Sequence, residues 1–281
     1  MNDEDPAVDW EGFSRTMARL EAAGETRCSP LLHVVKPIDR LVGRLVARET
    51  SPASDRPQDY VACVLGARAF RLTISSIHLA LSGYPDVCPN LYRTVWEIGV
   101  RLAHIAMHPV EGALGYLLQG ASEELVTVRV DTSDRGVSGD RALAAVALYE
   151  ERYAGHEQTA IARGLNPESL RRRHGKLNFR ETCRELGIER SYLVNYAWAS
   201  GYVHEKNWAT GEFVSVSGGG RLFELGPVSG AQPEAVADAL RTLLFALASA
   251  GLIIGDDAIS AEANAMCDGL DRRAKLAIAN Q

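Results

Sequence analysis

The sequence predicts an all-α protein, an antiparallel multi-helix bundle with one small β-hairpin near residues 212–225. Residues 58–82 and 86–108 are long, mostly apolar segments with helical periodicity. About four residues join them, which is typical of two antiparallel neighbouring helices. Only residues 211–225 change to short alternating runs around three glycines, and this pattern favours a β-hairpin.

The chain before the first long helix is predicted to be an N-terminal helical extension, residues 1–55. Residues 56–281 then form the core domain, with the hairpin as an insertion. Apolar residues recur at helical spacing in 6–23, the sequence GETRCSP is expected to break that helix, and a second helix is expected over 31–48. Pro37 is expected in the first turns of this second helix or at a kink in it.

Glycines and prolines mark the helix ends predicted in the core domain. Gly83 and Pro85 end the first long helix, Asp86 is expected to cap the next one, and Pro109 to stop it. A polar loop is expected over 131–140. The other predicted helices span residues 110–126, 141–155, 178–186, 189–204, 233–251 and 257–279.

Charge and composition restrict the classes of function. The formal net charge is −6 and the pI about 5.7, so no global basic field attracts nucleic acid, although local basic patches are compatible with these values. Five scattered cysteines without a CxxC spacing indicate reduced thiols rather than a disulfide framework or a zinc knuckle. No cofactor and no metal are expected.

Two features predict a cytoplasmic protein without a membrane segment. The sequence starts with an acidic stretch that lacks the apolar run of a signal peptide. The longest apolar run, residues 242–255, is too short to span a bilayer and is better explained as a core helix.

Two polar motifs are the main candidates for a functional site. Tyr196, Ser200 and His204 follow one another at four-residue steps, and Arg93 and Glu97 repeat this spacing about a hundred residues upstream. If the two helices face each other, the carboxylate can orient the imidazole for proton transfer while the guanidinium holds a phosphate. The alternative is a satisfied polar network that only fixes helix packing.

These motifs resemble a bacterial family known as domain of unknown function 5677. That family shows a helix with Arg-Thr/Ser-x-x-Glu, a following helix that ends near a proline, and a helix with Tyr-x-x-x-Ser-x-x-x-His. The matching residues are Arg93, Thr94, Glu97, Pro109, Tyr196, Ser200 and His204. The resemblance covers roughly residues 60–208 and departs from the family at Phe179, where a tryptophan is usual. The family is similar to the HEPN group of helical bundles, many of which are metal-independent ribonucleases in toxin–antitoxin or antiphage defence systems.

The resemblance implies a protein that binds RNA or nucleotide phosphates, or cleaves RNA without a metal. In that hypothesis His204 is the general base or acid, Glu97 orients it, Arg93 holds the phosphate, and Tyr196 and Ser200 position the substrate. HEPN-like bundles commonly pair, so a homodimer is expected, and a protein partner from a defence or antitoxin system fits the same setting. The alternative is a non-catalytic sensor, antitoxin-like protein or assembly module.

A second candidate group is Arg101, His104 and His108, which share one helix face. The HEPN nuclease signature is an arginine followed after four to six residues by a histidine, and Arg101 and His108 have this spacing. The two histidines at i and i+4 could also bind zinc, but no carboxylate accompanies them. The default explanation is a histidine pair that interacts favourably with the C-terminal end of a helix.

A third candidate is a basic run that could follow a phosphate backbone. Its members are Arg171, Arg172, Arg173 and Lys176. Glutamates are interleaved with the arginines in and after this run, so a solvated face with salt bridges is the competing and favoured interpretation.

Overall fold

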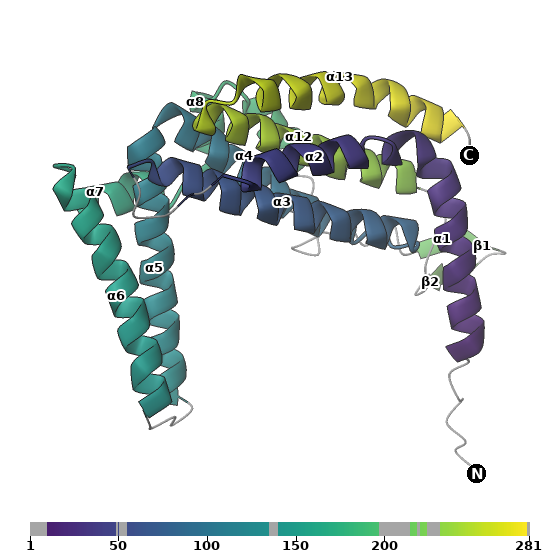
Figure 1. Cartoon of the computed structure of the whole chain (residues 1–281). Helices are drawn as coiled ribbons and strands as arrows, with labels where there is room; N and C mark the ends of the chain where they lie inside the picture. Colours follow the sequence, from purple (N-terminus) through teal and green to yellow (C-terminus); the bar gives the residue numbers. More distant parts are fainter. Residues whose placement is uncertain are drawn as a thin grey trace, which may run out of the picture.

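The computed structural model of the protein describes residues 10–48, 50, 55–134, 140–196, 214–217, 220–223 and 231–279. The predicted all-α class is confirmed: long antiparallel helices form a bundle (Figure 1). The helices of the bundle are α1 (Trp10–Leu32), α2 (Val35–Val46), α3 (Pro57–Leu81), α4 (Cys88–Met107), α12 (Gln232–Ile254) and α13 (Asp257–Ala279).

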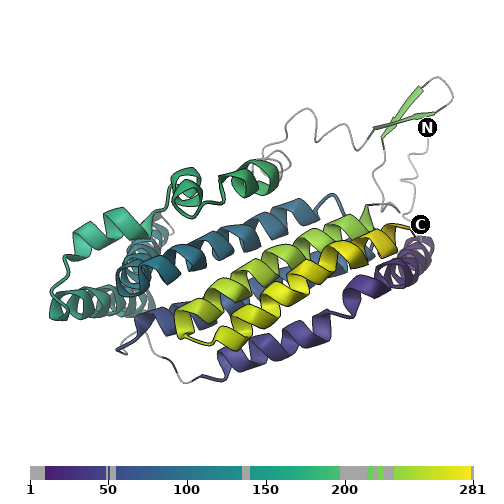
Figure 2. The ribbon, with the colours of Figure 1, turned by 90° about the horizontal axis from the view of Figure 1, so that it is seen from above.

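Three further parts of the chain are attached to this bundle. Helices α5 (Pro109–Asp134) and α6 (Asp140–Ala162) form a hairpin that projects from one end of the bundle (Figure 1). Short elements then follow, first against α5 and then along α4 (Figure 2). They are α7 (Pro167–Leu170), the π-helical turn η1 (Arg171–Gly175), α8 (Phe179–Glu185), α9 (Glu189–Ser191) and the π-helical turn η2 (Tyr192–Tyr196). Strands β1 (Val214–Ser217) and β2 (Gly220–Phe223) pair antiparallel, with Val214 opposite Phe223.

Helix α12 lies at the centre of the hydrophobic core and packs against α3, α4 and α13. It is apolar on nearly every side, as expected of a helix surrounded by others. By length and composition alone, α3 and α12 are long and apolar enough to cross a membrane. Half of the apolar window of α3 and 78% of that of α12 are buried within the protein, however, as in core helices. Helices α1 and α2 contribute Leu31, Ile38 and Leu45 to the same core.

The prediction of a break at GETRCSP is wrong, because α1 continues through this sequence to Leu32. Tertiary packing explains the difference. A Cβ atom on Gly24 would lie 2.9 Å from the backbone oxygen of Leu81, so this glycine permits close contact between α1 and the end of α3. Cys28 and Leu31, one and two turns later, are completely buried. Burial of this face outweighs the local helix-breaking tendency of the sequence.

Other helix boundaries also differ from the sequence-based expectation. The residue that caps α4 is Val87 rather than Asp86, and it makes no side-chain capping bond. The predicted polar loop is shorter, because α5 extends to Asp134 and α6 begins at Asp140. Polar residues continue these helices because they pair across the hairpin: Arg129 and Glu150 are 2.6 Å apart.

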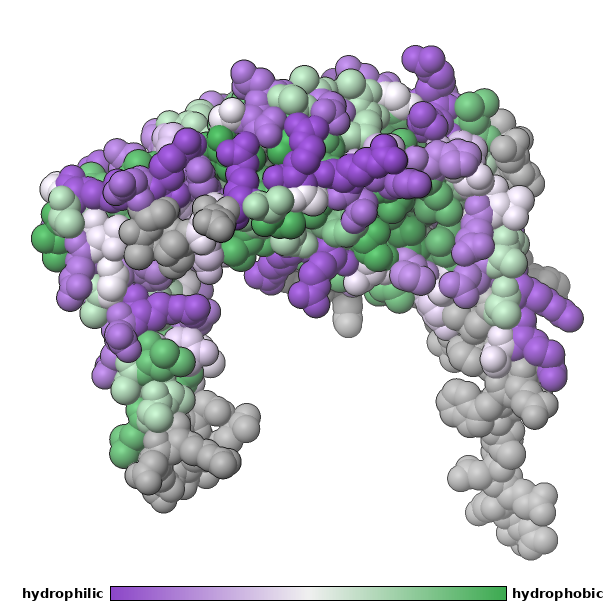
Figure 3. All heavy atoms as spheres, viewed as in Figure 1, coloured by the Kyte–Doolittle hydropathy of each residue, from purple (hydrophilic) through white to green (hydrophobic). Residues whose placement is uncertain are grey.

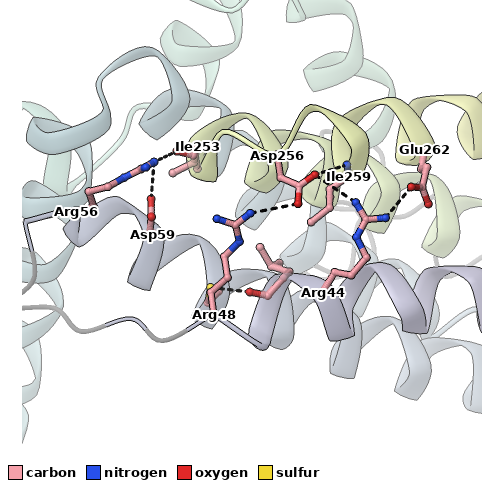
Figure 4. A network of polar contacts seen from close by, with 10 residues as sticks. Arg44, Arg48, Arg56, Asp59, Ile253, Asp256, Ile259 and Glu262 are labelled. Atoms are coloured by element: carbon pink, nitrogen blue, oxygen red, sulfur yellow. Dashed lines mark hydrogen bonds and ion pairs between the residues drawn. The ribbon is translucent and has the colours of Figure 1, made fainter.

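A polar network connects α2 to the turn between α12 and α13 (Figure 4). Asp256 accepts a hydrogen bond from the backbone N–H of Ile259 at 3.1 Å, so it caps the start of α13. This bond, followed by the arginines nearby, lowers the pKa of the Asp256 carboxyl. Arg44 and Arg48 each lie 3.2 Å from the same carboxylate, and Arg44 also contacts Glu262 at 2.6 Å.

We predict that Asp256→Ala lowers the free energy of unfolding by about 1–2 kcal/mol, the usual cost of losing a helix cap. Urea denaturation followed by circular dichroism measures the change. Asp268→Ala, at an exposed site of the same helix, is the control and should change stability by less than about 0.5 kcal/mol. Equal losses in the two variants would contradict the capping role.

Candidate functional site

A polar stripe runs along one side of α4 and continues past its C-terminal end. It consists of Arg93, Glu97, Arg101, His104 and His108, at positions i, i+4, i+8, i+11 and i+15. The short elements after α6 lie against this stripe, and the two π-helical turns make its principal polar contacts. Single π turns inside helical segments are frequently found at functional sites.

The first part of the stripe brings together three of the predicted site residues. Nε of Arg93 lies 3.1 Å from Oε1 of Glu97, and Nη2 of Arg93 donates to the Tyr196 hydroxyl at 2.8 Å. The guanidinium carbon is also 4.5 Å from the centre of the Tyr196 ring, a cation–π distance. The Arg93 side chain is only 16% exposed. Ser200 and His204 lie outside the described residues, so their proposed roles stay predictions.

Four aromatic rings surround this contact. Tyr192 and Tyr196 stack with ring centres 5.0 Å apart, and Phe179 stacks on Tyr196 at 6.0 Å. Trp96, which is almost completely buried, contacts the Tyr196 ring at 5.6 Å. Phe179 thus belongs to the aromatic group around Tyr196. The rings fix Tyr196, and through its hydroxyl they fix the Arg93 guanidinium.

Arg101 is held by the backbone of η1. Its Nη1 atom donates to the carbonyl oxygens of His174 and Gly175 at 2.8 and 2.9 Å. Its guanidinium carbon is 5.4 Å from the ring centre of Tyr116. Burial lowers the pKa of Arg101 to about 10, so the group remains cationic at neutral pH. These bonds anchor η1 to α4, a structural role that the nuclease-like spacing of Arg101 and His108 did not suggest.

Three histidine rings meet next to this anchor. The ring centres of His104, His108 and His174 are 5.0–5.3 Å apart, and Nε2 of His104 lies 3.1 Å from Nδ1 of His174. No group of three metal-ligating side chains in the described part of the chain could hold a metal ion. The spacing of His104 and His108 was visible in the sequence. The contact with His174 was not, because that residue lies on a π-helical turn about seventy residues later in the chain.

At least two of the three histidines, His104 and His174, are neutral at pH 7. Burial, followed by the charges of His174, His108 and Arg101, lowers the pKa of His104 to about 4. Burial also lowers the pKa of His174. Nδ1 of His104 is buried and has no hydrogen-bond partner among the described residues. We therefore assign the proton of His104 to Nε2, so that this N–H donates a hydrogen bond to Nδ1 of His174. The other tautomer would leave a buried N–H unpaired, which costs more than an unpaired lone pair.

Two glycines allow η1 to lie directly on α5. A Cβ atom on Gly115 would be 2.6 Å from Cβ of His174 and 2.8 Å from the oxygen of Leu170. A Cβ atom on Gly175 would be 2.8 Å from the oxygen of Gly115. Real Cβ atoms do not come so close to backbone atoms, so only glycine fits both positions. The close contact sets the position of the residues that follow η1.

A pocket of about 610 Å³ opens beside this contact, between α3, α5, α6 and the residues after η1. Its cations are Arg68, Arg101 and Lys176, and none of them forms a salt bridge with a described carboxylate. Its two carboxylates have other partners: Glu123 accepts from Gln119 at 2.6 Å, and Glu124 pairs with Arg152 at 2.9 Å. Tyr116, Tyr149 and Phe179 supply aromatic walls.

The predicted basic run separates into residues with different contacts. Arg171 pairs with Glu168 at 2.7 Å and donates to Ser122 at 3.0 Å, which is the salt-bridged surface that the interleaved glutamates favour. Arg172 and Arg173 are exposed on η1. Only Lys176 lines the pocket. Arg68, the other exposed cation of the pocket, belongs to no motif, and sequence reasoning missed it.

We predict that the histidine trio makes stability depend on pH. The pKa of His104 is lower in the folded than in the unfolded protein, so the unfolded state binds more protons below about pH 6.5. The free energy of unfolding therefore decreases as the pH is lowered. His104 alone should account for a loss of about 2 kcal/mol between pH 7 and pH 5. Urea denaturation at both pH values measures the loss.

The variant His104→Phe keeps a ring but cannot titrate, so its stability should decrease less over the same interval. Val100→Ala, at a buried neighbour on α4, is the control: it should lower stability equally at both pH values. An unchanged pH dependence in His104→Phe would show that this histidine does not cause the effect.

A family model described as Family of unknown function (DUF5677) matches residues 59–221, more than half of the sequence. No curated protein and no solved structure matches. The matched stretch includes α4, the pocket and the Arg93–Glu97–Tyr196 contact. The chain therefore belongs to the family of unknown function DUF5677.

Proposed function

We propose that the protein binds RNA or a nucleotide in the pocket between α3, α5, α6 and the end of η1. The observation that carries this proposal is the set of three cations without a carboxylate partner, Arg68, Arg101 and Lys176, in one pocket. Arg101 is largely buried, and a cation that is removed from water is costly unless an anion neutralises it. Arg68 and Lys176 are exposed and can reach a ligand in the pocket. A phosphate group supplies the missing charge and accepts hydrogen bonds from arginine in a planar geometry.

The other walls of the pocket suit the remaining parts of a nucleotide. Tyr116, Tyr149 and Phe179 offer rings for stacking of a base, an interaction worth about 1–3 kcal/mol per base. The volume of about 610 Å³ lies within the range of roughly 300–1,000 Å³ that small-molecule sites occupy. A simple inorganic anion would use the cations but leave the aromatic walls without a partner.

We predict that a fluorescein-labelled RNA hexamer binds the protein at low salt, and that 5′-mononucleotides compete with it. Lys176→Gln and Arg68→Gln should each weaken binding about tenfold. Lys176→Gln should also reduce the slope of the logarithm of the binding constant against the logarithm of the salt concentration by about one. Fluorescence anisotropy measures both quantities. Arg272→Gln, the same charge change at an exposed site of α13, should bind like the wild type. Equal loss in all three variants, or no binding at all, would refute the proposal.

Metal-independent cleavage of RNA is the second candidate function, and the contact between Arg93, Glu97 and Tyr196 favours it. These side chains adjoin Phe179, which contacts Tyr196 and lines the pocket. In this proposal Arg93 stabilises the phosphate, and Glu97 orients His204, which takes the proton of a ribose 2′-hydroxyl. The 2′-oxygen attacks the phosphorus to form a 2′,3′-cyclic phosphate, and the bond from phosphorus to the 5′-oxygen breaks. The 5′-oxygen leaves as a hydroxyl with a proton from water, and protonated His204 returns its own proton to the solvent. Such an activity would fit a toxin or defence protein that acts as a homodimer.

We predict that purified protein cleaves single-stranded RNA in the presence of a chelator, and that His204→Ala abolishes the cleavage. Gel analysis of end-labelled RNA detects the products. His33→Ala, at an exposed histidine of the turn between α1 and α2, is the control and should retain full activity. Cleavage that survives His204→Ala would exclude the assigned base. Absence of cleavage, with lower thermal stability of Glu97→Ala, would favour the non-catalytic alternative.

A further inference from the structure

A second hollow of about 260 Å³ continues the pocket along the same three helices. Tyr116, Gly120 and Glu124 of α5 line both spaces. On α3, Val64 lines the hollow, and Arg68, one turn later, lines the pocket. On α6, Arg152 lines the hollow, and Tyr149, one turn earlier, lines the pocket. The two spaces are therefore successive stretches of one groove, which is bordered by α3 and α6 and crosses α5.

The chemistry of the hollow differs from that of the pocket. It has no unpaired cation, because its arginine, Arg152, is bound to Glu124. Its walls are mostly apolar, from Val61, Leu117 and Ala121 together with the rings of two tyrosines. This hollow offers no site for a phosphate, but it offers surfaces against which a flat ring can stack.

One polar side chain in the hollow has no partner. His156 is only 8% exposed and makes no hydrogen bond with the described part of the chain. Burial lowers its pKa, so the ring is neutral at pH 7 and presents one donor and one acceptor. Its ring nitrogens are not completely enclosed by the protein, so they are open to the hollow. The edge of a nucleobase carries both donors and acceptors and can form hydrogen bonds with them.

We infer that the ligand of the groove is a single strand of at least two nucleotides, with the second base in the hollow next to His156. This inference rests on the proposed function of the pocket. A volume of about 260 Å³ is below the usual size of a site for a whole small molecule, but it can hold one ring system. The charged part of the ligand lies in the pocket, and the neighbouring base extends from it across α5.

Gly120 is the point at which the strand crosses α5. It lines both spaces, and a Cβ atom placed on it would have no neighbour within 4 Å. Glycine is a poor helix former, and most residues would favour the helix more at this position. A Cβ atom therefore fits at this position, and a longer side chain built on it would stand between the pocket and the hollow. It would therefore separate the two spaces while leaving each of them intact.

The experiment compares 5′-AMP and 5′-UMP with the 5′-phosphorylated dinucleotides pApA and pUpU by isothermal titration calorimetry. The wild type should bind a dinucleotide about tenfold or more tightly than the corresponding mononucleotide. Gly120→Gln should remove this difference, because its side chain would stand between the pocket and the hollow. Gly43→Gln, at an exposed glycine of α2 that also has no neighbour within 4 Å, should keep the difference.

Tyr60→Leu, which removes an aromatic wall of the hollow, should also reduce the preference for dinucleotides without affecting mononucleotides. Equal affinity of the wild type for both ligands would overturn the inference and leave the proposed function intact. The same would follow if Tyr60→Leu, at a residue that lines only the hollow, weakened both ligands alike. Failure of every mononucleotide and dinucleotide to bind would overturn the proposed function and the inference with it.

Discussion

The burial of α12 is the constraint on which the arrangement of the other helices depends. A helix that is apolar on all sides is stable only when other helices enclose it, and α3, α4 and α13 do so. The contacts are close: a Cβ atom on Gly99 of α4 would lie 2.5 Å from the ring of Phe245, and one on Gly251 would lie 2.5 Å from Oγ of Ser260. The contact at Gly99 fixes the rotation of α4 about its own axis, and the contact at Gly251 brings α13 close to α12.

The rotation of α4 determines where its polar stripe points. Because one side of α4 packs on α12, the side that begins with Arg93 and ends with His108 faces the short elements that follow α6. Guanidinium and imidazole groups that are covered by other elements need hydrogen-bond partners. Carbonyl groups of η1 accept hydrogen bonds from Arg101, and the hydroxyl of Tyr196 in η2 accepts one from Arg93. The candidate site is therefore a product of how the core is packed.

The sequence predicted those features that depend on local periodicity. The long helices, among them α4 with Arg93 and Glu97, and the end of α8 before Gly187 with its positive φ are visible as spacings of apolar, glycine and polar residues. Of the helix predicted over residues 189–204, the structure describes 189–196, as the short α9 and the π-helical turn η2. Features that depend on tertiary contact were not predictable. His174 joins two histidines of α4 only because η1 crosses α5 at Gly115, and Arg68 belongs to the site only because α3 borders the pocket. The helical path of GETRCSP likewise depends on contact with α3.

The two π-helical turns affect how this sequence should be aligned with other family members. A π turn contains about one residue more than an α turn, so deletion of that residue would leave a continuous helix. Every later side chain would then rotate by about 100° around the helix axis. In η2 such a shift would move the Tyr196 hydroxyl away from Arg93 while the amino-acid types stayed the same. An alignment that ignores single-residue gaps at η1 and η2 would therefore equate side chains that point in different directions.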